Sequence, residues 1–129
     1  MKPAKGHPQP LISEEMKAWA TALATETADW PKLSQRSFFG FTALYRGDKI
    51  FAMLPRTCNL EAANTITFKF ATPTAAILKA LGDDPRIGYI DRENARWRTF
   101  LLSSNADLHD ALDWLGQAYE AAGKRKKSR

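Results

Sequence analysis

The sequence has a single cysteine, Cys58, and only two histidines, His7 and His109. One cysteine excludes an intrachain disulfide and a metal site built on several cysteines of the chain. A cysteine nucleophile needs a base beside it in space, and two histidines offer few chances of that. We therefore predict that Cys58 is an ordinary thiol and not a catalytic residue.

Long apolar runs are also missing. The first ten residues, MKPAKGHPQP, contain three prolines and no apolar stretch, unlike a secretory signal. No later stretch approaches the roughly 20 apolar residues that a helix needs to cross a bilayer. We expect a cytoplasmic protein without a membrane partner.

The common signatures of phosphate-binding loops and of nucleophile elbows are absent. The chain contains no G-x-x-x-x-G-K-[ST], no G-x-G-x-x-G and no G-x-S-x-G. General acid–base catalysis usually needs a carboxyl group whose pKa is raised by an apolar enclosure. Four carboxylates of the central region occur instead in polar, turn-like sequence: Asp83, Asp84, Asp91 and Glu93. We predict that the protein is not an enzyme and uses no cofactor.

One group of potential metal ligands occurs near the end of the chain. His109 and Asp113 are four residues apart, hence one helical turn apart, and Asp110 lies between them. A single imidazole with exposed carboxylates gives weak affinity for a transition metal. We predict a charged helix surface here and no metal site.

The residues that are present fit one folded domain. Of the 129 residues, 44% are hydrophobic and 11% are aromatic, which is enough to build a core. We predict a flexible tail over residues 1–10, a single domain over residues 11–123 and a basic tail over residues 124–129.

The net charge of +5 is distributed unevenly. Seven of the basic residues lie in the two tails, and residues 6–123 carry a net charge of −2. Within that body, residues 6–31 carry −3, residues 32–98 carry +5 and residues 99–123 carry −4. Because the cations gather in the middle of the chain, their arrangement in space decides whether they form a site for a polyanion.

Two amphipathic helices are predicted at the ends of the domain. Ser13 can cap the first helix, whose first turn holds Glu14 and Glu15 at the positive end of the helix dipole, and Trp30-Pro31 ends that segment. The last helix begins near Asn105, and Gly123 terminates it.

Alternating apolar residues between the two helices predict hairpins. Residues 41–46 and 49–54 flank Gly47-Asp48, a two-residue loop that suits a type II′ turn. The loop sets Tyr45 opposite Ile50 and Leu44 opposite Phe51. We expect the face that is apolar throughout to point into the core. That face consists of Phe41, Ala43, Tyr45, Ile50, Ala52 and Leu54.

Further strands are predicted at residues 34–39, 65–70, 87–90 and 97–102, with a short helix between residues 72 and 82. The element order predicts an α+β fold, in which an antiparallel sheet packs against N- and C-terminal helices and a short helix is inserted between strands. The other sheet face would be at least partly open to solvent. The predicted core includes Trp19, Leu23, Tyr45, Ile50, Phe68, Leu112 and Leu115.

The same alternation predicts a basic sheet face away from the core, where Phe51, Thr42 and Thr67 lie among the cations. Cations neutralise phosphates, and an exposed ring can stack on a base. A solvated face whose cations discourage edge pairing has the same pattern, so both interpretations stay open. The candidate nucleic-acid-binding residues of the sheet are Arg36, Arg46, Lys49, Lys69 and Arg98.

The basic tail adds a second, less specific set of candidates: Lys124, Arg125, Lys126 and Lys127. A short basic tail can hold any polyanion, and it can equally serve solubility.

Three segments resemble a known group of bacterial proteins. Phe38-Phe39-Gly40, then residues 49–52 of the hairpin, then residues 66–69, are similar to the small N-terminal domain of TfoX-type competence regulators and to the MmcQ/YjbR group. Trp97, followed by Leu108, Leu112 and Ala118-Tyr119, resembles the closing strand and helix of those groups. The resemblance covers residues 11–123 and implies an α+β domain without established catalysis, often discussed as DNA-binding or regulatory. Most of the matching residues are of structural types, so the resemblance bears on the fold more than on the function.

We therefore expect a non-enzymatic regulatory or binding domain that contacts nucleic acid through its basic sheet face and tail. Two alternatives stay open. One is an adaptor for another protein, for which Trp114 is a candidate because it lies about 100° from the centre of the apolar face of the last helix. The other is a module that binds a small molecule between sheet and helices.

Overall fold

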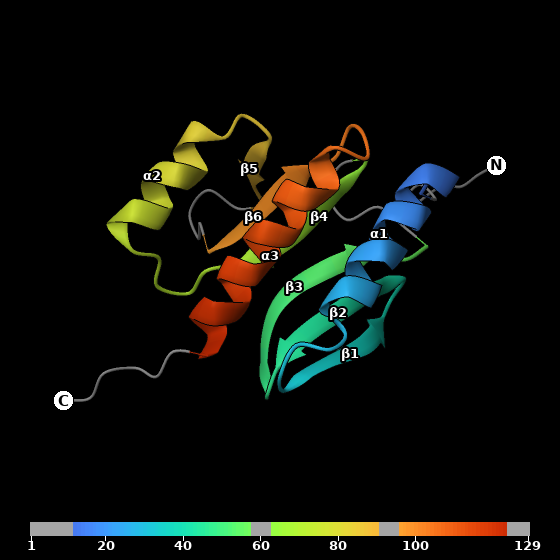
Figure 1. Ribbon diagram of the computed structural model, residues 1–129, viewed down its shortest axis with the longest axis horizontal. Coiled ribbons are helices and arrows are strands. Elements are labelled where there is room, and N and C mark those ends of the chain that lie inside the picture. Colours follow the sequence, from blue (N-terminus) through green and yellow to red (C-terminus); the bar gives the residue numbers. More distant parts are fainter. Residues whose placement is uncertain (1–11, 58–62, 91–95, 124–129) are drawn as a thin grey trace, which may run out of the picture.

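The computed structural model describes residues 12–57, 63–90 and 96–123. These residues form a six-stranded sheet and three helices (Figure 1). In chain order the elements are α1 (Glu14–Thr27), β1 (Leu33–Phe38), β2 (Phe41–Arg46), β3 (Lys49–Pro55), β4 (Thr65–Lys69), α2 (Ala75–Asp83), β5 (Ile87–Tyr89), β6 (Trp97–Leu101) and α3 (Asp107–Gly123).

The sheet has the strand order β1-β2-β3-β4-β6-β5, and every neighbouring pair is antiparallel. The two long helices, α1 and α3, run over the same side of it, while α2 lies beyond them near β5 (Figure 1). The predicted α+β fold, with N- and C-terminal helices on an antiparallel sheet and a short helix inserted between strands, is confirmed.

Local signals explain where the helices begin. The Ser13 hydroxyl accepts a hydrogen bond from the Met16 N–H at 3.0 Å, as expected for an N-cap. Thr74 caps α2 in the same way, two residues after the predicted start. Asn105 lies just before α3, where its side-chain oxygen accepts a 2.6 Å hydrogen bond from the Trp19 indole and so joins the start of α3 to α1.

The core lies between the sheet and the helices. Trp114 of α3 stacks on Phe68 of β4 with a ring separation of 5.8 Å, and Phe70 meets the same indole edge-on. Of the predicted core residues, Trp19, Leu23, Phe68 and Leu115 are buried there, and Leu112 is half-buried against it.

The β2–β3 hairpin contains a β-bulge that the sequence did not predict. Arg46 pairs with Lys49 and Tyr45 with Ile50, as expected, but Leu44 pairs with Ala52. Phe51 is therefore the extra residue, and both Phe51 and Ala52 lie on the helix side. The assignment of the two hairpin faces was wrong for β2 and for Ile50, and it was correct for Ala52 and Leu54, which are buried in the core. Leu44 and Phe51 are fully buried in the core, whereas Tyr45 and Ile50 are half-buried on the other side.

Candidate binding face of the sheet

We call the sheet face away from α1 and α3 the open face. It is built from alternate strand residues, and none of them belongs to the apolar core cluster between sheet and helices. All three described helices contribute to that cluster or pack against it. The open face comprises Ser34, Arg36, Phe41, Ala43, Tyr45, Ile50, Met53, Thr65, Thr67, Lys69, Gly88, Trp97, Thr99 and Leu101.

A single row of paired residues crosses the open face from edge to edge. In strand order it is Arg36, Ala43, Met53, Thr67, Thr99 and Gly88. Most members of the row are small, so larger side chains border it. At the β5 end the packing is close, because a Cβ atom on Gly88 would lie 2.9 Å from the Thr99 hydroxyl oxygen.

Two cation–aromatic pairs lie on this face. The guanidinium carbon of Arg36 is 4.8 Å from the ring centre of Tyr45, and the ammonium of Lys69 is 5.9 Å from the ring of Trp97. Arg36 is exposed and the other three residues are half-buried. Tyr45 is on β2 and Trp97 on β6, three strand spacings apart, which corresponds to roughly 14 Å.

The sheet carries charge of one sign only. No Asp or Glu occurs in any of the six described strands, which hold five basic residues. The acidic residues of the neighbouring layer lie in α1 and above all in α3, which includes Asp107, Asp110, Asp113 and Glu120. The open face is thus positively charged and free of competing carboxylates among its described members.

The structure separates the five predicted sheet cations. Arg36 and Lys69 share the open face, but Arg46, Lys49 and Arg98 do not, so their assignment to it was wrong. Lys49 is exposed beside the β2–β3 turn, opposite Arg46 and hence on the helix side.

The two misplaced arginines follow the alternation of their strands. Arg46 shares the helix side with Leu44, and its guanidinium lies 4.2 Å from the ring of Tyr119 and donates to the Tyr119 carbonyl at 3.1 Å. Arg98 shares that side with Phe100 and lies 4.4 Å from the ring of Tyr89, with only 5% of the residue exposed.

Several residues outside the described ranges or on the other face complete the comparison with the sequence. The tail candidates Lys124, Arg125, Lys126 and Lys127 lie outside the described residues. Thr67 is on the open face as expected, whereas Thr42 and Phe51 face the helices. Sequence reasoning missed Trp97 and Tyr45 as open-face rings, although the alternation of Phe100 in β6 and Leu102 just after it was a usable signal for Trp97.

The structure does not support Trp114 as the exposed contact residue of a protein adaptor. Trp114 is 7% exposed and stacked in the core, so it does not form an exposed apolar edge. The buried side of α3 is turned toward Trp114 and away from Leu112 relative to the prediction.

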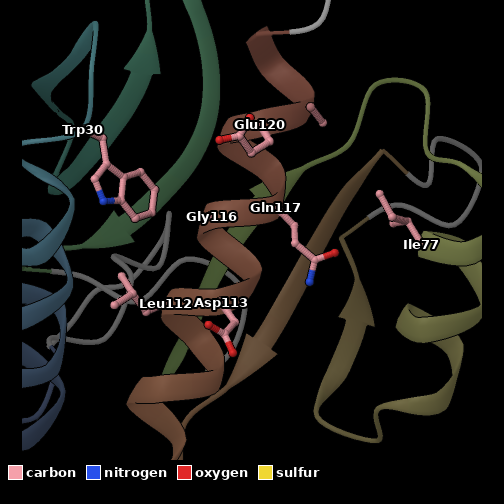
Figure 2. Close-up of a pocket in the computed structure, with 8 residues that line it drawn as sticks. Trp30, Ile77, Leu112, Asp113, Gly116, Gln117 and Glu120 are labelled. Atoms are coloured by element: carbon pink, nitrogen blue, oxygen red, sulfur yellow. The ribbon is translucent and has the colours of Figure 1, made fainter.

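Two hollows lie on the helix side of the molecule. One, of about 540 Å³, borders α3, where Asp113 and Gln117 project from the helix between Trp30 on one side and Ile77 of α2 on the other (Figure 2). The other, of about 560 Å³, lies between α1 and strands β1–β3 and is lined mainly by alanines and threonines, with Lys17 and Arg56. Neither brings together a nucleophile, a base and an orienting group, as catalysis would require.

An ionic cluster joins β5 to α3. The Arg86 guanidinium donates to Asp84 at 2.9 Å, to Asp107 at 2.8 Å and to Asp110 at 3.1 Å. The hydrogen bond from Arg86 is the main cause that lowers the pKa of Asp84, and the Ser103 backbone N–H is the main cause that lowers the pKa of Asp107. The cluster is half-buried and satisfied by its own members, which indicates a structural role.

His109, Asp110 and Asp113 do come together on the surface of α3, with ligating atoms within 4.8 Å of one another. However, Asp110 is already bound by Arg86. The absence of a metal site remains a prediction.

No family model, no curated protein and no solved structure matches this chain. The resemblance to the TfoX and MmcQ/YjbR groups therefore stays a prediction. Among the described helices, none is both long and apolar enough to cross a membrane.

Proposed function

We propose that the protein is a binding domain, not an enzyme, and that the open face holds single-stranded nucleic acid. The observation that supports this most directly is the presence of two cation–aromatic pairs, Arg36 with Tyr45 and Lys69 with Trp97, on a sheet without acidic residues. Single strands are bound by rings that stack on bases and by cations that neutralise the backbone.

The geometry favours a single strand over a duplex. A sheet surface with half-buried rings offers stacking platforms, which are accessible to unpaired bases and not to bases inside a helix. The separation of roughly 14 Å between β2 and β6 is long enough for intervening nucleotides. Ala43 and Thr67 in the row between them are buried, so the contacts would come from the half-buried rings and from the two cations. In this proposal Tyr45 and Trp97 stack on two bases, and Arg36 and Lys69 contact phosphates next to them.

The basic tail adds affinity without specificity. Residues 124–129 contain five cations directly after α3. Each phosphate neutralised on a single strand contributes about 0.7 to the slope of log affinity against log salt. Ending the chain at Gly123 should therefore lower affinity and flatten the salt dependence while leaving the melting temperature unchanged.

The test is a titration of a labelled single strand of about 12 nucleotides, and of the matching duplex, at about 50 and 200 mM salt. The wild type should bind the single strand more tightly, and Lys69→Gln and Trp97→Leu should each weaken binding. Lys79→Gln on α2 is the matched control, since it removes the same charge from an exposed helix residue.

The outcome separates the remaining functions. If Lys69→Gln and Lys79→Gln weaken binding equally, the open face is merely solvated and only overall charge matters. If the wild type binds neither form at low salt, nucleic acid is excluded as the ligand. The half-buried apolar residues of the same face, Ile50 and Met53, then favour a protein partner.

A further inference from the structure

The turn between β1 and β2 presents an aromatic residue in an unusual conformation. Phe39 has a φ of +48° and Gly40 a φ of +88°, so both central residues of the turn are left-handed. Such turns favour Asn-Gly or Asp-Gly, because a bulky side chain is strained at positive φ. Phe39 is nevertheless there, and it is 84% exposed, more than any other large hydrophobic residue described.

Hydrogen bonds brace the β1–β2 turn, which we call the tip. The Gly40 carbonyl accepts hydrogen bonds from the Arg56 and Thr57 N–H groups, both at 2.9 Å, which ties the turn to the end of β3. The Thr57 carbonyl in turn accepts from the Ile12 N–H at 3.2 Å, next to the start of α1. Phe39 is therefore carried on a braced turn, so little conformational freedom is lost when its ring makes a contact.

The turn itself does not require a ring at this position, because other residues suit its left-handed backbone better. A strained backbone that also exposes an apolar side chain is unfavourable on both counts, and such outliers concentrate at functional positions. Exposed, rigidly held aromatic residues are typical anchors of binding surfaces.

The surroundings of the tip indicate the kind of ligand. Phe41, directly after the turn, is on the open face, and Arg36 on that face precedes Phe39 by three residues. Arg56, whose N–H braces the turn, is exposed as well. No acidic residue occurs in the two strands that the turn connects or in β3. Arg36 on the open face and Arg56, which lines the hollow beside α1, thus place one cation on each side of the sheet near the turn. Cations near an exposed ring suit an unpaired base with its phosphate.

We propose that Phe39 stacks on an unpaired base of a single-stranded nucleic acid where the strand passes the β1–β2 turn, and that Arg56 contacts the adjoining phosphate. This inference rests on the proposed function and extends the open face to the end of the sheet. The face then has three stacking positions, on the β1–β2 turn, β2 and β6.

Three substitutions at one position test the role of the ring. Phe39→Asn suits the left-handed turn but has no ring, Phe39→Leu keeps the apolar bulk without a π face, and Phe39→Tyr keeps the ring. With the same single strand as probe, Asn and Leu should each weaken binding roughly 5- to 150-fold, the range that corresponds to loss of one stacked base. Phe39→Tyr should bind like the wild type. Melting temperatures of all three variants exclude unfolding as the cause.

The results distinguish this inference from the proposed function. If Trp97→Leu weakens binding and Phe39→Asn does not, the open face binds nucleic acid, the role of Phe39 is refuted, and the tip is left for a protein partner. Retained affinity in Phe39→Leu would also refute stacking. If the wild type binds no single strand, both proposals fail. A loss in Asn and Leu together with retention in Tyr supports the inference.

Discussion

Replacing Trp114 tests the core and the rejected adaptor surface in one experiment. The indole is 7% exposed, stacks on Phe68 at 5.8 Å with an interplanar angle of 6°, and meets Phe70 edge-on at 6.3 Å. Its N–H also forms a hydrogen bond that helps to lower the pKa of Asp84. Trp114→Ala therefore removes a buried ring, two aromatic contacts and one hydrogen bond together.

The expected loss in the free energy of unfolding is about 4 kcal/mol, within the range for a buried aromatic residue cut back to alanine. Trp114→Phe keeps the ring contacts with Phe68 and Phe70 and loses the hydrogen bond, so it should lose only about 1–2 kcal/mol. Leu78→Ala on the exposed side of α2 is the control and should change stability by less than about 0.5 kcal/mol.

Urea unfolding followed by far-ultraviolet circular dichroism measures these differences. With an m-value of about 2 kcal/mol/M, the midpoint of Trp114→Ala should fall by about 2 M, and that of Trp114→Phe by less than 1 M. A fall of less than about 0.5 M in Trp114→Ala would refute the buried stack. It would also restore Trp114 as a candidate for an exposed apolar edge.

Three further predictions concern stability. Phe39→Asn should raise the melting temperature, because asparagine tolerates positive φ and the substitution relieves about 1 kcal/mol of backbone strain. The pKa of Asp107 is lowered in the folded state, so the Asp107 carboxylate stabilises the fold above its ordinary pKa of 3.8. This stabilisation is lost as the pH falls below 3.8. Urea midpoints measured from neutral to acid pH should therefore decline less steeply in Asp107→Asn than in the wild type. Gly88→Ala should lower the melting temperature through the close contact with the Thr99 hydroxyl, and Thr99→Ala in the same chain should restore it; the absence of such a rescue would contradict that contact.

The fold class followed from the sequence because its signals are local. The Ser13 cap, the glycine in the β2–β3 turn and the change of apolar spacing between helices and strands each involve residues close together in the chain. Short connections then account for the antiparallel pairs β1–β2 and β2–β3, whereas β4 pairs with β6 across the α2–β5 segment. These are the features that sequence patterns report best.

The faces of the hairpin depend on one residue that no local signal marks. A two-residue loop fixes pairing at the turn, so Arg46 with Lys49 and Tyr45 with Ile50 were correct. The bulge at Phe51 moves all later residues of β3 by one position, and a shift of one exchanges the two faces of a strand. The choice of buried face also depended on α3, whose Tyr119 covers Arg46.

The candidate site was therefore only partly predictable. Arg36 and Lys69 could be placed by alternation, because neither requires a distant partner to lie on an open face. Arg98 could have been placed in the same way, because the alternation that puts Phe100 in the core also puts Arg98 on the helix side, where it lies over the ring of Tyr89. An arginine can cover an aromatic surface with its long stem and planar head, so its charge alone is a poor guide to exposure.

Because the strands lack acidic residues, positive and negative charges are separated between the sheet and the helical layer. The described residues carry equal numbers of basic and acidic side chains, yet the cations concentrate in the sheet and the anions in α1 and α3. Such a domain has an electric dipole moment that runs from the helical layer to the sheet. A negatively charged polymer or a cation-exchange resin would turn the approaching protein sheet-first before any contact forms. Orientation by that field would speed productive encounters at low ionic strength and disappear as salt shortens its range.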